Sequence, residues 1–189
     1  AKHVDALLVI NNERLRQVYP ELSLIEAFKR ADDTLSVAAK SIAEIITLHG
    51  FMNLDFNDVK MVLEDGGVAI MSSGYGEGEG RLQQAIFDAL NSPLLNDNDV
   101  FHAKKLLLNI SFSNKNNQGS NLMMEEINYV DEFMAKFSPD FVFKWGVTFD
   151  ENLGEKVKVT VLATGFGVED ITDTPQRTQL RTIREAEEA

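Results

Sequence analysis

A long amphipathic segment, residues 23–50, constrains the fold more than any other feature of the sequence. Ser23 followed by Glu26 matches a capping box, in which each side chain accepts a hydrogen bond from an otherwise unpaired backbone N–H. Gly50 supplies a stop signal. Between them, apolar residues recur at the spacings of three and four that one helix face requires: Phe28, Ala31, Leu35, Ala38, Ile42 and Ile45. The pattern predicts a helix of about 26 residues, about 39 Å long, which is enough to span a small domain.

The rest of the chain alternates between strands and helices, which predicts an α+β fold with α/β-like alternation. Residues 4–10 form a branched apolar run typical of a strand buried on both faces, and because no neighbouring segment is suited to pair with it, we expect its partners upstream of Ala1. Turn residues at 150–154 predict that the last two strands form a hairpin. The later elements are expected as helix 56–65, strand 68–72, helix 81–90, strand 104–112, helix 121–137 and strands 141–149 and 156–163.

Composition excludes several classes of function. With 30 acidic against 18 basic residues, the net charge of -12 repels nucleic acid and anionic membrane surfaces, so we expect neither as a direct partner. The chain has no cysteine, which excludes a disulfide framework, a thiolate zinc site and a cysteine nucleophile, and which fits the cytoplasm. The three histidines are scattered without an i, i+4 pair, so we predict no metal site.

The polar segment 53–58, Asn-Leu-Asp-Phe-Asn-Asp, lies between the long helix and the next one. If Asp55 caps the second helix, Asp58 occupies its third position, and both carboxylates face the free N–H groups and the positive end of the helix dipole. Both are then expected to stay ionised at neutral pH. An ordinary capping box also explains this spacing. On spacing alone, the cap is favoured over an active site.

The glycine-rich segment 74–80, GYGEGEG, lies between a predicted strand and a predicted helix, where phosphate-binding loops occur. Glu77 and Glu79 would place negative charge where a phosphate should bind, and no Lys-Ser or Lys-Thr pair follows. The segment is therefore better interpreted as a flexible connection.

Phe28 and Asp32 lie one turn apart on the long predicted helix and therefore share a face. An aromatic ring beside a carboxylate suits a purine base, which stacks on the ring and donates its exocyclic N–H groups to the carboxylate. Without further support, the pair is better explained as a core residue beside a solvated charge.

The segment GFMNLDFNDVK, residues 50–60, resembles the synergy loop of the FtsZ family, the bacterial cell-division relatives of tubulin. Five further segments resemble family segments in the same order and with compatible spacing. They are VDALLVINNERL at 4–15, LIEAFKRADDTL at 24–35, NSPLL at 91–95, LLLNIS at 106–111 and FDENLGEKVKVTVLATGF at 149–166. The resemblance covers about residues 1–168, and this collinear order is much more specific than any one motif.

The resemblance implies a division of the chain. Residues 1–22 correspond to the last strand and a short helix of the family's GTP-binding domain, and residues 23–50 to its central helix. Residues 51–168 correspond to the C-terminal domain, which has a four-stranded mixed sheet flanked by helices and begins with the loop 50–60. Residues 169–189 correspond to a tail or the start of a linker.

The resemblance also implies a function, that of the GTP-dependent filament protein of the division ring. By residue-level match, Asn12, Phe28 and Asp32 face the guanine base. Asn53, Asp55 and Asp58 belong to the catalytic loop, which enters the nucleotide pocket of the next subunit and helps to position the attacking water. We therefore expect GTP or GDP with Mg²⁺ in the complete protein, a longitudinal homopolymer, and a cytoplasmic location at the septum.

Two family features have no match in this sequence. The glycine-rich signature that binds the phosphates is absent, so we expect the isolated chain to be inactive as a GTPase. The C-terminal peptide through which the family binds other division proteins is absent as well.

Two alternatives remain open at this point. In one, the chain is a non-enzymatic α+β interaction module in which 53–58 only caps a helix. In the other, it belongs to a divergent tubulin-like filament protein with another role. A glycine-rich signature upstream would exclude the first alternative, and filament morphology and cellular location would test the second.

Overall fold

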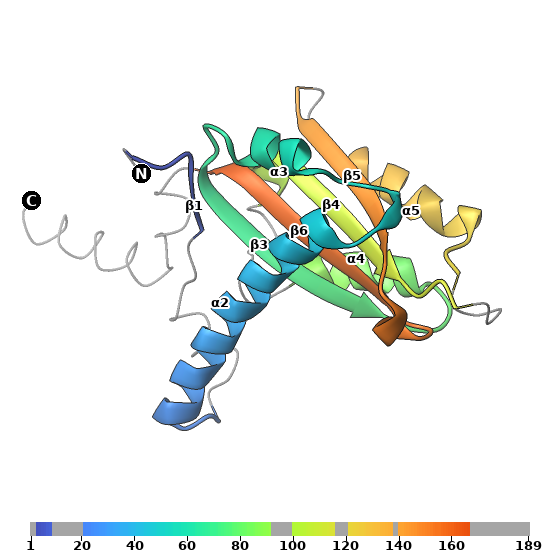
Figure 1. The fold of residues 1–189 in the computed structure, drawn as a ribbon, viewed down its shortest axis with the longest axis horizontal. Helices are drawn as coiled ribbons and strands as arrows, with labels where there is room; N and C mark the ends of the chain where they lie inside the picture. The colour runs from blue at the N-terminus through green and yellow to red at the C-terminus, as the bar shows by residue number, and fades with distance from the viewer. Residues whose placement is uncertain (1–2, 9–20, 92–99, 116–120, 138–139, 167–189) are drawn as a thin grey trace, which may run out of the picture.

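The structure is a computed structural model that describes residues 3–8, 21–91, 100–115, 121–137 and 140–166 (Figure 1). These residues form a mixed sheet with the strand order β1-β3-β6-β4-β5-β2. Its six strands are β1 (Ala6–Leu8), β2 (Gly50–Met52), β3 (Gly67–Gly76), β4 (Lys105–Phe112), β5 (Val142–Phe149) and β6 (Val157–Phe166). The expected four-stranded sheet corresponds to the four long strands at its centre, and the three-residue strands β1 and β2 extend it at the two edges.

The predicted hairpin between the last two strands is wrong, because β4 lies between β5 and β6. Strand β4 pairs in parallel with β5 and antiparallel with β6, so its apolar residues are buried in the middle of the sheet. The connecting residues form a 3-10 turn, Glu151–Leu153, at the end of β4, where the Asp150 N–H donates to the Phe112 carbonyl over 2.9 Å. Residues 150–154 thus connect β5 to β6 across β4 and do not form a hairpin.

Helices cover both faces of the sheet (Figure 1). Helices α4 (Arg81–Leu90) and α5 (Met124–Met134) pack over one face, and α2 (Leu24–Thr47) and α3 (Phe56–Leu63) contact the other. Each face has its own apolar core, and burial of these cores is the main favourable term in folding. In the part of the chain that the structure describes, no helix combines the length and apolarity needed to cross a bilayer.

Helix α2 confirms the predicted N-terminus and corrects the predicted end. The Ser23 backbone N–H donates to Glu26 Oε2 over 3.0 Å, and the Glu26 N–H donates to Ser23 Oγ over 3.4 Å, which completes the capping box. The helix has 24 residues and ends at Thr47, because Gly50 starts strand β2 instead of terminating the helix.

The apolar stripe of α2 is buried only along its C-terminal half. Ala38 and Ile45 pack in the core, whereas Phe28 and Leu35 are exposed. Figure 1 shows the reason: the N-terminal half of α2 extends beyond the sheet. The apolar stripe of α2 therefore continues past the part of the helix that packs against the sheet.

Strand β1 also differs from the prediction. It pairs in parallel with β3, with Ala6 opposite Gly67 and Leu8 opposite Ala69, so one partner lies within this chain, where the prediction found none. Leu7 is exposed, which is inconsistent with a strand buried on both faces. Residues 9–10 of the predicted strand lie outside the described part of the chain.

Strand β3 is longer than predicted because the first glycines of the segment 74–80 continue it. A Cβ atom on Gly74 would lie 2.2 Å from the Ala85 carbonyl oxygen, and one on Gly76 would lie 1.8 Å from that of Arg81. These glycines allow helix α4 to pack directly on the backbone of β3. The turn itself is confined to the residues before α4, where Gly78 and Gly80 have positive φ angles.

The other helices are close to the predictions. Helix α4 has the predicted bounds, and α3 ends two residues before the predicted end at 65. Helix α5 starts later than the predicted cap at Asn121, since its N-cap is Met123, whose backbone N–H donates to Glu126 Oε2 over 2.7 Å.

Candidate functional site

The loop that follows α2 is held against the sheet at its start. Strand β2 pairs antiparallel with the end of β5, placing Gly50 opposite Thr148. A Cβ atom on Gly50 would lie 1.8 Å from the Val147 carbonyl oxygen, so only glycine allows this approach. Asn53 closes the turn, with its Oδ1 accepting from the Gly50 N–H over 2.6 Å.

Leu54 anchors the middle of the loop. Its side chain is 4% exposed and belongs to the core under α2 and α3. The space it fills exists because residue 146 is glycine: a Cβ atom there would lie 2.5 Å from Leu54 Cγ. Burial of a leucine side chain contributes about 1.5–3 kcal/mol, which offsets part of the entropy lost in ordering the loop.

Asp55 and Asp58 form the predicted cap of helix α3. The Asp58 N–H donates to Asp55 Oδ1 over 2.9 Å, and the Asp55 N–H donates to Asp58 Oδ2 over 3.1 Å. Both carboxylates therefore lie at the positive end of the α3 dipole, as the spacing predicted. The cap uses Asp55 Oδ1, and the Asp55 side chain is exposed.

Lys144 on β5 makes a further contact that the sequence did not predict. Its Nζ lies 3.1 Å from Asp58 Oδ1. Partial burial would raise the pKa of Asp58, but the hydrogen bonds from the Asp55 N–H and Lys144, together with the Lys144 charge, outweigh it and hold that pKa below its usual value. Asp58 is thus ionised at neutral pH. Alternation along β5 places Lys144 on the same face as Gly146, but no local pattern links it to Asp58.

The residues expected to face a guanine base are not brought to this loop. Phe28 and Asp32 are both exposed, so Phe28 is not the core residue of the simpler interpretation. From Phe28 to the end of α2 at Thr47 the helix rises about 29 Å, and the loop begins only beyond that end. Asn12 lies outside the described residues.

Exposed aromatic side chains flank the carboxylates. Phe51 precedes Asn53 and is 83% exposed, and Phe56 follows Asp55 and is 63% exposed. Large apolar groups exposed beside polar groups commonly mark an interaction surface. The exposure of these two aromatic side chains was not predicted from the sequence, because apolar residues around 53–58 are equally consistent with burial.

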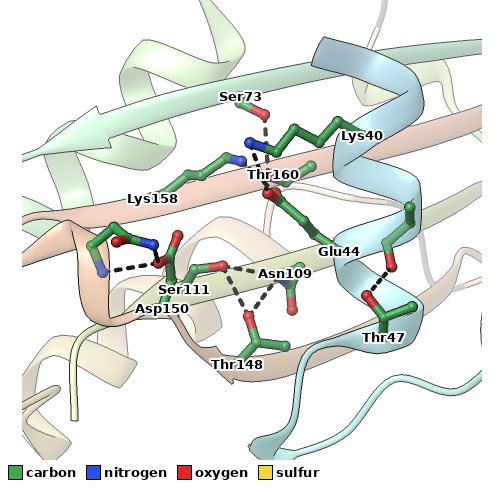
Figure 2. Close-up of polar contacts among 12 residues, drawn as sticks. Lys40, Glu44, Thr47, Ser73, Asn109, Ser111, Thr148, Asp150, Lys158 and Thr160 are labelled. Carbon is green, nitrogen blue, oxygen red and sulfur yellow. Dashed lines mark hydrogen bonds and ion pairs between the residues drawn. The ribbon is translucent and has the colours of Figure 1, made fainter. Parts of the chain in front are cut away.

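A buried polar seam connects α2 to the sheet beside the loop (Figure 2). Glu44 on α2 accepts from Lys158 Nζ over 3.1 Å. Asn109 Nδ2 donates to Ser111 Oγ and to Thr148 Oγ1, each over 3.1 Å. The Lys158–Glu44 bond thus links the C-terminal half of α2 to β6, and the Asn109 cluster joins β4 to β5.

A metal site is not built by this part of the chain. Across the described residues, no group of three histidine, cysteine or carboxylate side chains could hold a metal ion. We assign Asp55 and Asp58 no metal ion.

Comparison with known proteins decides the family. The family model described as FtsZ family, C-terminal domain, matches residues 67–167, which is more than half of the chain. The chain belongs to the FtsZ family. This membership removes the interpretation as an unrelated α+β interaction module.

Individual relatives of the FtsZ family agree. The chain is 51% identical over 168 residues to cell division protein FtsZ of Porphyromonas gingivalis, covering 89% of this chain and 36% of that protein. It is 41% identical to cell division protein FtsZ 1 of Thermococcus kodakarensis, covering 87% of this chain and 42% of that protein. The chain therefore spans less than half of the length of either relative.

Solved structures show the same fold. An FtsZ dimer of M. jannaschii, described as empty, is similar with a TM-score of 0.73 and 38% identity, over 87% of this chain and 46% of that one. A helical model of a four-stranded TubZ-Bt filament has a TM-score of 0.69 at 9% identity, over 98% of this chain and 50% of that one. At that identity the second match shows the fold alone.

Proposed function

We propose that this chain is the C-terminal half of a GTP-dependent filament protein of the bacterial division ring, and that its loop 50–60 promotes hydrolysis in the next subunit. The relatives named cell division protein FtsZ support the role, and the solved FtsZ dimer supports self-association. One observation carries the proposal: the Asp55 and Asp58 carboxylates cap the start of α3 on a loop beyond the C-terminal end of α2, whereas Phe28 and Asp32 lie near its N-terminal end.

The loop residues divide the work according to their free atoms. Asp55 Oδ2 accepts a hydrogen bond from the attacking water, because its other oxygen is already used in the cap. Asp58 adds a second fixed negative charge beside it. Asn53 uses Oδ1 to hold the turn, which leaves its Nδ2 to donate to a phosphate oxygen or to the water. Transfer of the γ-phosphoryl group of GTP to water depends largely on such positioning.

In this proposal, the guanine base and the phosphates of one bound nucleotide are contacted by two different subunits. Phe28 and Asp32, with Asn12, face the guanine of their own subunit, and the loop 50–60 acts on the nucleotide of its neighbour. The length of α2 supports this division, since one chain cannot bring both ends of a helix about 36 Å long to one nucleotide. The exposed Phe51 and Phe56 pack against the neighbouring subunit around the loop.

The proposed role places the chain in a longitudinal homopolymer at the septum, in the cytoplasm, with GTP and Mg²⁺ bound mainly by the upstream half. Residues 1–22 complete that half, 23–50 form the central helix, 51–168 form the C-terminal domain and 169–189 begin the linker. Other division proteins bind through a C-terminal peptide outside this sequence.

Assembly of the complete protein tests the proposal. Addition of GTP should produce sedimentable filaments that disassemble as GTP is consumed. The Asp58→Ala variant should form filaments that persist, because it binds GTP without hydrolysing it. Filaments that form equally well with GDP, or an Asp58→Ala variant that consumes GTP at the normal rate, would contradict the proposed role.

A further inference from the structure

Helix α3 is held at both ends by lysines from neighbouring strands. At its C-terminal end, Lys105 Nζ of β4 donates to the carbonyl oxygens of Met61 and Glu64, over 3.0 Å and 2.5 Å. At its N-terminal end, Lys144 Nζ of β5 lies 3.1 Å from Asp58 Oδ1. Strands β4 and β5 pair directly, so both lysines are fixed to the same rigid part of the sheet.

Of these two lysines, Lys144 is the one that contacts a carboxylate used in the proposed function. Asp58 Oδ2 accepts from the Asp55 N–H, and Oδ1 faces the Lys144 ammonium. A single hydrogen bond leaves a carboxylate free to rotate about it, whereas contacts to both oxygens fix the plane of the group. The side chains of Lys144 and Asp58 are 38% and 22% exposed, so the pair is shielded from water more than an ordinary surface ion pair and yet remains open to a neighbouring molecule.

We propose that Lys144 is a positioning residue for Asp58, which holds this carboxylate in the orientation that the next subunit's nucleotide requires. The inference rests on the proposed function of the loop. Lys144 suits the role because it comes from a central part of the sheet, whereas Asp55 comes from the loop itself. An Asp58 carboxylate that is held by both Lys144 and the Asp55 N–H moves with the domain and not with the loop. Catalytic geometry is sensitive to displacements of about 1 Å, which can lower a rate by about 10²-fold.

The test uses the complete protein with Lys144→Met, Lys144→Arg and a control. Lys156→Met is the control because Lys156 forms an exposed pair with Glu77 over 3.6 Å, and its loss removes the same charge elsewhere. We expect Lys144→Met to lower kcat for GTP about 10-fold with GTP affinity within about twofold of the parent. Lys144→Arg should retain at least about half of the activity, since its guanidinium also reaches a carboxylate, and Lys156→Met should be unchanged.

A double variant separates positioning from a general structural effect. In the Asp58→Ala background, adding Lys144→Met should not lower kcat further, because the group that Lys144 orients is already gone. Lys144→Gln provides a second variant, with the same expectation, if Lys144→Met reduces the amount of folded protein.

Three outcomes overturn the inference or its basis, and they are distinguishable. If Asp58→Ala abolishes turnover while Lys144→Met and Lys144→Gln keep it within about twofold of the parent, Lys144 has no positioning role. If Lys144→Met still costs about 10-fold in the Asp58→Ala background, Lys144 acts on something other than Asp58. If Asp58→Ala itself retains full turnover, the proposed function of the loop fails irrespective of Lys144.

Discussion

Asp55 and Asp58 accept hydrogen bonds from each other's backbone N–H groups, over 3.1 Å for the Asp55 N–H and 2.9 Å for the Asp58 N–H. The residues that cap α3 are therefore the same residues to which the proposed function assigns catalysis. The cap fixes the backbone of both residues and keeps both carboxylates at the start of α3. We infer that this arrangement prepares them to act on a neighbouring molecule.

The first prediction concerns the pH dependence of stability. The folded-state pKa of Asp58 lies below its usual value, so its ionised form stabilises the folded state above the unfolded-state pKa of about 3.9, and this contribution is lost as the pH falls through the folded pKa. Asp58→Ala should therefore lower the free energy of unfolding at pH 6, and the difference from the parent should shrink towards pH 3. Urea titrations at both pH values measure it, and a difference that is constant or larger at pH 3 would contradict the assignment.

The second prediction concerns the packing of Leu54 against Gly146. In Gly146→Ala the new methyl group would lie 2.5 Å from Leu54 Cγ and 2.7 Å from the Met52 carbonyl oxygen, so the loop must move. We expect a loss of about 1–3 kcal/mol in the free energy of unfolding. Val142→Ala on the half-exposed start of the same strand is the control and should change stability by less than about 1 kcal/mol. Equal stability of the Gly146→Ala variant and the parent would show that Leu54 does not depend on this contact.

The parts of the fold and the site that were predictable depend on residues close in sequence. Both capping boxes, at Ser23 and at Asp55, join residues three apart, and the bounds of α4 follow from a local apolar period. Such contacts form within a single turn of helix, so the sequence pattern determines them without knowledge of the tertiary structure.

The predictions are wrong where contacts between segments distant in sequence determine the structure. The turn at 150–154 suits a hairpin, but the strand order places the buried strand β4 between β5 and β6. Gly50 and Gly74 look like breaks, yet each is required because another backbone approaches it closely. Lys144 could not be paired with Asp58 from the sequence, because strand order and register bring them together.

The third prediction concerns the 189-residue chain on its own. It should hydrolyse GTP at a negligible rate and bind it weakly at most. In the proposed function Phe28 and Asp32 contact only the base, and the chain has no glycine-rich phosphate-binding signature. Isothermal titration calorimetry with GTP, with the complete protein as positive control, measures this directly. Micromolar affinity in the isolated chain would mean that the nucleotide site has been misplaced.

The fourth prediction concerns the two carboxylates in the complete protein. Asp55→Ala and Asp58→Ala should each lower GTP turnover by about 10² to 10⁴ while leaving nucleotide affinity nearly unchanged. The reason is that, in the proposed function, the loop acts on the phosphate of another subunit and does not contribute to the pocket of its own. Steady-state turnover and equilibrium GTP binding, measured on the same preparations, separate the two effects. Loss of GTP binding in either variant would place the carboxylate in its own pocket.

Complementation between two inactive variants of the complete protein tests the central claim most directly. One variant carries Asp58→Ala, which leaves its pocket intact, and the other has its upstream phosphate-binding segment disabled, which leaves its loop intact. Mixed filaments contain interfaces where an intact loop meets an intact pocket, so the mixture should hydrolyse GTP well above the sum of the two parents. If copolymers form and the mixture is no more active than that sum, the loop does not act in the neighbouring subunit, and Asp55 and Asp58 serve only to cap helix α3.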